Sequence, residues 1–192
     1  MSGDRLAAEQ IERAPSGPRR WLPVLAVVAV IAIVAGGGQL AAATGNAATA
    51  GTQELGAAVR VRPLPGWAAA TPPGAPLPER SLTRGSVTLL VVAVPRWSGS
   101  PEDLAQTYLD RTLRPRLDDL KIGQSSSGTL ASGAPAVRFG YVGVADGVTI
   151  EGAATVATGA TTGAIFDAFA PKGDLAWVAS DVDTMIEDAE VG

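Results

Sequence analysis

The chain has 192 residues, enough for one compact domain with short additions, and it contains neither cysteine nor histidine. This composition excludes disulfide bonds, thiolate nucleophiles, Cys/His zinc sites and catalytic triads that depend on histidine. The formal net charge of −4 and the apolar fraction of 46% argue against a nucleic-acid-binding protein and against a disordered chain.

The N-terminal part contains a candidate membrane segment. Residues 1–20 mix charged residues with Ser, Pro and Gly, and we expect them to form a cytoplasmic tail. Residues 21–43 carry no charge and begin with an aliphatic run, and they reach the about 20 residues that a transmembrane helix needs. The sequence therefore predicts a single membrane-spanning anchor. It predicts neither a cofactor nor a metal ion.

Cations flank this segment on one side only. Arg19 and Arg20 precede it, whereas the next cation in the chain is Arg60, which predicts a cytoplasmic N-terminus and an extracytoplasmic C-terminal domain. A cleaved secretory signal is the alternative interpretation, because Ala41 to Ala43 offer an Ala-x-Ala cleavage pattern. A third alternative keeps the domain inside the cell.

A flexible tether over residues 44–54 is expected to precede a folded domain over residues 55–192. Val59 to Arg62 alternates apolar and cationic side chains and predicts a short strand. Six prolines between Pro63 and Pro78 predict an extended loop rather than a regular element. Residues 86–94 are continuously apolar and predict a strand buried on both faces.

A helix is predicted to begin after Ser100. This serine can cap the helix, Pro101 suits its first position, and two acidic residues follow near the positive end of the helix dipole. An apolar stripe continues to Leu113, and Pro115 ends the pattern, so the helix should have about four turns.

Strands are predicted to follow this helix. Residues 136–144 and 148–156 should pair as an antiparallel hairpin, because Asp146-Gly147 between them is a typical two-residue turn. A further strand is expected over residues 164–170.

A last helix is predicted to start with Asp174 as its cap and to bury one apolar stripe on the sheet. The stripe consists of Leu175, Val178, Val182, Met185, Ile186 and Ala189. The order of elements indicates an α+β domain, in which helices pack on an antiparallel sheet.

Several local phrases in this order resemble the PsbP-like superfamily, over about residues 57–190. The phrases are Pro65-Gly66-Trp67, the helix start Ser100 to Leu104, Ala134-Pro135-Ala136 leading into residues 137–141, Gly152, and the closing helix from Leu175. The resemblance implies a non-enzymatic assembly, stabilising or adaptor module, with no catalytic motif and no cofactor. The actinobacterial members, anchored or secreted, resemble accessory factors of the cell envelope.

Two groups of residues are candidates for binding. The arginines near the start of the domain suggest a patch for an anionic partner or lipid headgroup, or alternatively a solvated face: Arg60, Arg62, Arg80, Arg84 and Arg96. Three tryptophans suggest a groove for a lipid or peptide, or alternatively parts of the core: Trp67, Trp97 and Trp177.

Acidic residues offer a weaker alternative. Asp118 with Asp119, Glu151 or Asp167 would have to converge in a cleft for carboxylate-dependent hydrolysis. We expect instead an interaction module for an envelope or membrane protein, with lipid or amphiphile binding as the alternative function. No metal site is predicted, because the acidic residues of the last helix lie on its outer side.

Overall fold

The computed structural model describes residues 51–55, 58–70 and 77–192. The predicted tail and anchor, residues 1–20 and 21–43, lie outside the described residues. Within the described ranges, no helix combines the length and the apolar composition that crossing a bilayer requires.

An antiparallel sheet of eight strands, counted over the described ranges, forms the centre of the domain. Its strands are β3 (Ala68–Ala70), β4 (Glu79–Arg84), β5 (Val87–Pro95), β6 (Asp118–Ile122), β7 (Ser126–Thr129), β8 (Pro135–Ala145), β9 (Val148–Thr158) and β10 (Thr162–Pro171). Their spatial order is β3-β4-β5-β10-β9-β8-β6, and β7 also pairs with β8.

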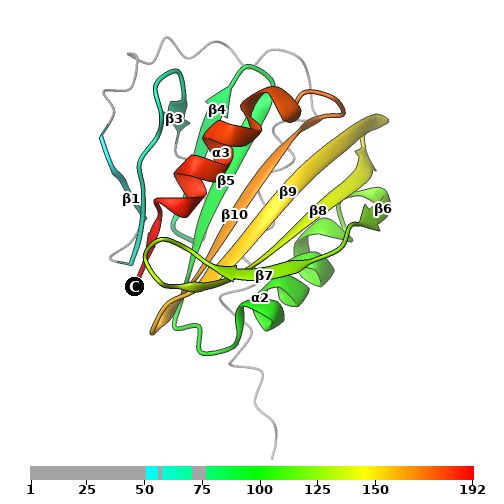
Figure 1. The fold of residues 1–192 in the computed structure, drawn as a ribbon. Helices are drawn as coiled ribbons and strands as arrows, with labels where there is room; N and C mark the ends of the chain where they lie inside the picture. Colours follow the sequence, from blue (N-terminus) through cyan, green and yellow to red (C-terminus); the bar gives the residue numbers. More distant parts are fainter. Residues whose placement is uncertain (1–50, 56–57, 71–76) are drawn as a thin grey trace, which may run out of the picture.

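Helices cover both faces of this sheet (Figure 1). On one face lies α2 (Pro101–Tyr108), which continues as the π-helical segment η3 (Leu109–Leu113). On the other lies α3 (Ala179–Glu187), preceded by the 3₁₀ turn η4 (Ala176–Val178). The predicted α+β class is therefore confirmed.

A small second sheet joins the two ends of the described chain. It consists of β1 (Gln53–Leu55), β2 (Val59–Val61) and β11 (Glu190–Val191), in the order β1-β2-β11. The predicted strand at residues 59–62 is confirmed, and its alternation buries Val59 and Val61 while Arg60 stays exposed.

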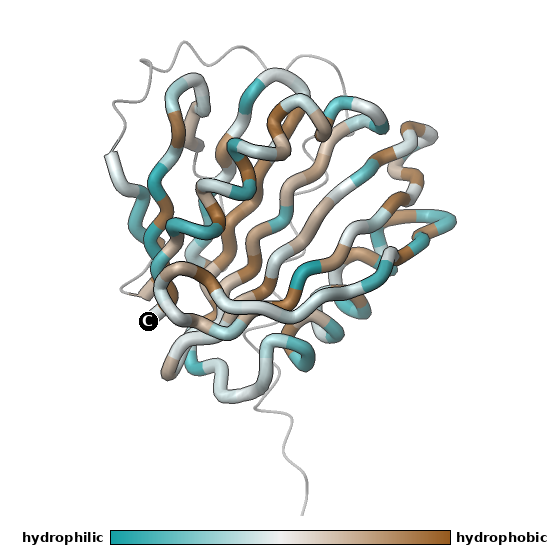
Figure 2. Tube along the Cα trace, viewed as in Figure 1, coloured by the Kyte–Doolittle hydropathy of each residue, from teal (hydrophilic) through white to brown (hydrophobic). Residues whose placement is uncertain are grey.

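The sheet separates two hydrophobic cores because alternate residues of each strand face opposite helices. Leu89 and Val91 of β5 pack in the core beneath α3, whereas Leu90 and Val92 pack in the core beneath α2. The predicted central strand is thus confirmed as β5, with both faces buried. Figure 2 shows the apolar residues concentrated along β5 and β10.

The predicted hairpin and first helix are also confirmed. Ala145 pairs with Val148 across the two-residue turn, in which Asp146 and Gly147 have φ angles of 48° and 79°. Ser100 caps α2 and forms a capping box with Asp103.

The prediction that Asp174 caps the last helix is wrong. Its carboxylate accepts a hydrogen bond from the Ser86 hydroxyl at 2.7 Å, and Val178 occupies the N-cap position of α3. The expected apolar stripe is nevertheless confirmed, because Val182 and Met185 are buried against the sheet.

The prediction of an extended loop between Pro63 and Pro78 is wrong in part. Residues 68–70, predicted as loop, form β3, because the edge of β4 supplies the pairing that three alanines do not themselves signal. Residues 71–76 of that stretch lie outside the described residues.

Candidate functional site

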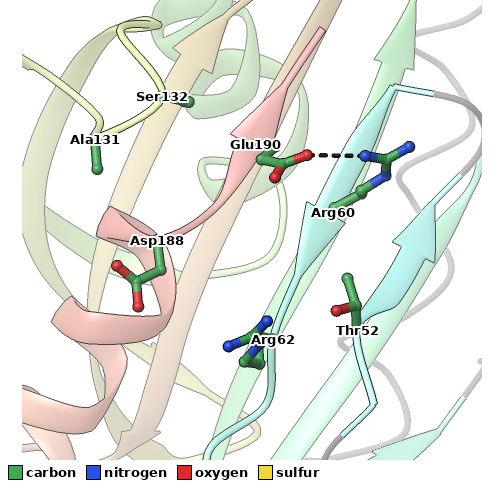
Figure 3. A pocket seen from close by; sticks show the side chains of 7 residues that line it. All are labelled: Thr52, Arg60, Arg62, Ala131, Ser132, Asp188 and Glu190. Atoms are coloured by element: carbon green, nitrogen blue, oxygen red, sulfur yellow. Dashed lines mark hydrogen bonds and ion pairs between the residues drawn. The ribbon is translucent and has the colours of Figure 1, made fainter.

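A mixed-charge pocket of about 380 Å³ opens where the small sheet meets the turn after β7 (Figure 3). We use this name for the hollow lined by Thr52, Arg60, Arg62, Ala131, Ser132, Asp188 and Glu190. The alternation of β2 explains its cationic side, since burying Val59 and Val61 turns Arg60 and Arg62 outward.

The two arginines of this pocket differ in their electrostatic surroundings. Nε of Arg60 lies 3.3 Å from a carboxylate oxygen of Glu54, and its Nη1 lies 3.0 Å from Oε2 of Glu190. Arg62 makes no ion pair or side-chain hydrogen bond with any described residue. Arg62 is therefore the cation of the pocket that is available to an external anionic group.

The structure brings together only two of the five predicted arginines in this pocket. Arg84 on β4 forms an ion pair with Asp181 of α3, and its guanidinium lies 5.2 Å from the ring centroid of Trp177. Arg96 follows the other end of β5, in the left-handed conformation with a φ of 58°. Arg80 is half-buried on β4 and donates to the Glu79 carbonyl at 3.3 Å.

The three predicted tryptophans lie on two sides of the sheet. Trp67 is buried in the core beneath α3, and its Nε1 donates to Asp181 at 3.3 Å. Trp177 lies in η4, the turn before that helix, and is 55% exposed. Trp97 packs against the opposite core, so the three side chains do not line one common groove.

A second arrangement was not predicted as a unit. We call it the buried carboxylate cluster, and it consists of Glu79, Tyr108, Arg116, Tyr141 and Asp167. It lies between the sheet and the helical segment α2–η3. The sequence signal was Asp167, a single acidic residue within an otherwise apolar strand.

Asp167 is the best-bonded member of this cluster. Its side chain is completely buried and accepts hydrogen bonds from the Tyr108 hydroxyl at 2.5 Å and the Tyr141 hydroxyl at 2.9 Å. Burial raises the pKa of Asp167 from 3.8 to about 6, and the two tyrosine hydrogen bonds and the charge of Arg116 counteract that rise.

Glu79 lacks such hydrogen bonds. It is 2% exposed, and neither carboxylate oxygen has a hydrogen-bond partner in the part of the chain that the structure describes. Burial raises the pKa of Glu79 from 4.5 to about 7, against the opposing charge of Arg116. Burial likewise lowers the pKa of Arg116.

The other acidic candidates do not join Asp167. Asp118 and Asp119 are exposed at the β6 edge, and Glu151 accepts hydrogen bonds from the backbone N–H groups of Gly173 and Leu175. Among the described residues, no group of three or more acidic, His or Cys side chains is placed to hold a metal ion.

Comparison with known proteins identifies the fold. No protein-family model matches the chain, and no curated protein matches it. Cyanobacterial PsbP (CyanoP) from Synechocystis is similar in structure, with a TM-score of 0.56 and 16% identity over 77% of this chain and 96% of that chain. LpqN of Mycobacterium tuberculosis, involved in cell envelope biogenesis, has a TM-score of 0.54 and 13% identity over 69% of this chain and 82% of that chain. These similarities establish a PsbP-like fold.

Proposed function

We propose that this chain is a single-pass accessory protein of a cell envelope, of the actinobacterial kind. Its PsbP-like domain, residues 55–192, lies outside the cytoplasm and binds an envelope or membrane protein without catalysing a reaction. Residues 21–43 anchor it, and residues 1–20 stay in the cytoplasm.

The distribution of charge and hydropathy supports this topology. An uncharged segment of sufficient length follows Arg19 and Arg20, and the positive-inside rule then directs the C-terminal domain outward. The likeness to LpqN, a protein involved in cell envelope biogenesis, supports an envelope role for a domain of this fold.

The mixed-charge pocket carries the binding part of the proposal. Arg62 has no described ion-pair partner, while Thr52 and Ser132, whose hydroxyl groups can donate hydrogen bonds, line the same hollow. A guanidinium with neighbouring hydroxyl donors suits a carboxylate on a partner surface. The carboxylates of Asp188 and Glu190 can accept donors from the same partner and so define its orientation.

Site-directed photo-crosslinking of the full chain in cells tests this function. A photoreactive residue replaces Thr52 at the pocket or, in a separate chain, Asp146 at the hairpin turn. We expect a defined protein adduct from position 52 and none from position 146. Arg62→Glu should reduce this adduct at least about tenfold by charge repulsion, because like charges across an interface are strongly unfavourable.

Arg96→Glu is the matched control, because Arg96 is exposed and outside the pocket. It should leave the adduct unchanged. Identical adducts from both positions, no adduct from position 52, or an adduct insensitive to Arg62→Glu would each count against the proposed function.

A further inference from the structure

Glu79 occupies an unusual position for an acidic residue. It is the first residue of β4, pairs with Val92 of β5 and faces the core beneath α2. Ionising a carboxylate there is costly, because its buried oxygens have no hydrogen-bond donor among the described residues. The protonated form avoids that cost.

Asp167 lies on the same face of the sheet as Glu79. Leu90 pairs with Asp167, and Val92 pairs with Glu79, and both Leu90 and Val92 belong to the core beneath α2. The two tyrosine hydroxyl groups provide the ionised Asp167 with donors, which Glu79 does not have. Asp167 is therefore the carboxyl group of the pair that ionises more easily.

The described elements packed around the two carboxyl groups supply one cation and no further acidic group. Tyr108 of α2, Tyr141 of β8 and Arg116 after η3 are the titratable groups that act on the two carboxyls. From β5 and β9, the side chains on this face are apolar: Leu90, Val92, Val94, Ala154 and Val156. The single guanidinium, that of Arg116, compensates the negative charge of one carboxylate. The other carboxyl group therefore retains its proton.

A proton is the ligand that this arrangement fits. The positive charge of Arg116 already acts on both carboxyl groups, and the described residues hold no cluster of three or more metal-ligating side chains. The better hydrogen bonding of Asp167 assigns the retained proton to Glu79.

We propose that Glu79 is a proton-binding switch, which keeps the start of β4 closed on the sheet when protonated and loosens it when the proton leaves. This inference goes beyond the proposed function and does not depend on it. Ionised Glu79 gains hydration when the first residues of β4 separate from β5. This end of β4 can separate from β5 with the fewest broken backbone contacts, because Glu79 is the first residue of the strand and Pro78 precedes it.

Amide hydrogen exchange of the full chain, compared at pH 5 and pH 8, tests this switch. The Ala93 amide donates to the Pro78 carbonyl at 2.9 Å and reports on the start of β4. After correction for intrinsic exchange, its protection should fall on the order of a hundredfold, the linkage expected for a pKa raised from 4.5 to about 7. The Gly123 amide, bonded to the Gly140 carbonyl at 2.8 Å, is the internal control and should not respond.

Glu79→Gln keeps the shape of the side chain and removes the ionisation, so it should abolish the response at Ala93. Glu187→Gln, at an exposed position of α3, should retain it. Unchanged protection of Ala93 in the unmodified chain, or an equal fall in Glu79→Gln, overturns the proposal.

Should Glu79→Gln fail to fold, carboxyl ¹³C NMR of the unmodified chain decides. A Glu79 midpoint near 7 supports the switch, and a midpoint below pH 5 overturns it.

Discussion

Gly152 shows how a missing side chain shapes the buried carboxylate cluster. It pairs with Tyr141 across β8 and β9, and a Cβ atom at position 152 would overlap the tyrosine ring. A larger residue must therefore displace the hydroxyl that donates to Asp167. This glycine, one of the residues that resemble the PsbP-like superfamily, thus has a steric role.

Gly152→Ala should lower the free energy of unfolding by about 1–3 kcal/mol, the usual cost of overpacking a core. Gly128→Ala is the matched control, because Gly128 lies on exposed β7 and an added Cβ atom there would meet open space. The control should stay within about 0.5 kcal/mol of the unmodified chain. Chemical denaturation of both variants measures the difference, and equal stabilities would contradict the steric role.

The pKa of Asp167 determines how its hydrogen bonds contribute to stability. A carboxyl group whose pKa is higher in the folded than in the unfolded chain stabilises the fold while it is protonated. This contribution to the free energy of unfolding decreases as the group ionises. For Asp167 this stabilising contribution is fully present below about pH 3.8 and is lost as the pH rises through about 6. At pH 8 the fold depends on the donors that compensate the buried charge.

Tyr108→Phe removes one of these donors and should raise the pKa of Asp167 further. We expect a cost of about 1.5–3 kcal/mol at pH 8, where the hydrogen bond is to a charged group, and about 0.5–1.5 kcal/mol at pH 4. Urea unfolding at the two pH values measures both costs in one variant. A cost that is the same at both would show that Asp167 does not ionise in the folded chain.

At the scale of the elements, α2 depends on the residue that caps it. The Ser100 hydroxyl accepts from the Asp103 amide at 3.1 Å, and the Asp103 carboxylate accepts from the Ser100 amide at 3.2 Å. Ser100→Ala should therefore reduce the free energy of unfolding by about 1 kcal/mol. Ser180→Ala, at an exposed position of α3, is the control and should cause no loss. A thermal melt that ranks the two variants equally would contradict the capping role.

Elements with a local signal were predictable from the sequence. Ser100-Pro101 determines a helix start, and Asp146-Gly147 determines a hairpin turn, so both were located correctly. The strand β4 has polar residues at most positions and becomes a strand through pairing with β5. Asp174 has the chemistry of a cap, but its carboxylate instead accepts a hydrogen bond from the hydroxyl of Ser86, which lies between β4 and β5. Tertiary contacts decided these two cases.

In the candidate sites, too, only the features with a local sequence signal were predictable. Alternation in β2 predicted that Arg60 and Arg62 share a side. The pocket itself needs Glu190, 130 residues further along the chain than Arg60, and no local pattern predicts that contact. The placement of Glu79 on the same face as Asp167 likewise depends on the strand order, because β5 separates β4 from β10.

At the scale of the whole molecule, the sheet carries a helix on each face and two separate cores. The small sheet brings β11 at the C-terminal end beside β2 near the start of the domain (Figure 1). The mixed-charge pocket thus includes Thr52, which lies within the range 44–54 of the expected tether.

Labelling with a membrane-impermeant maleimide tests the central claim of this topology most directly. The chain contains no cysteine, so a single introduced cysteine reports its own location. Ser98→Cys probes an exposed loop of the domain, and Ser16→Cys probes the proposed cytoplasmic tail. We predict labelling of Ser98→Cys in intact cells and of Ser16→Cys only after lysis. Labelling of both variants only after lysis would contradict an extracytoplasmic domain.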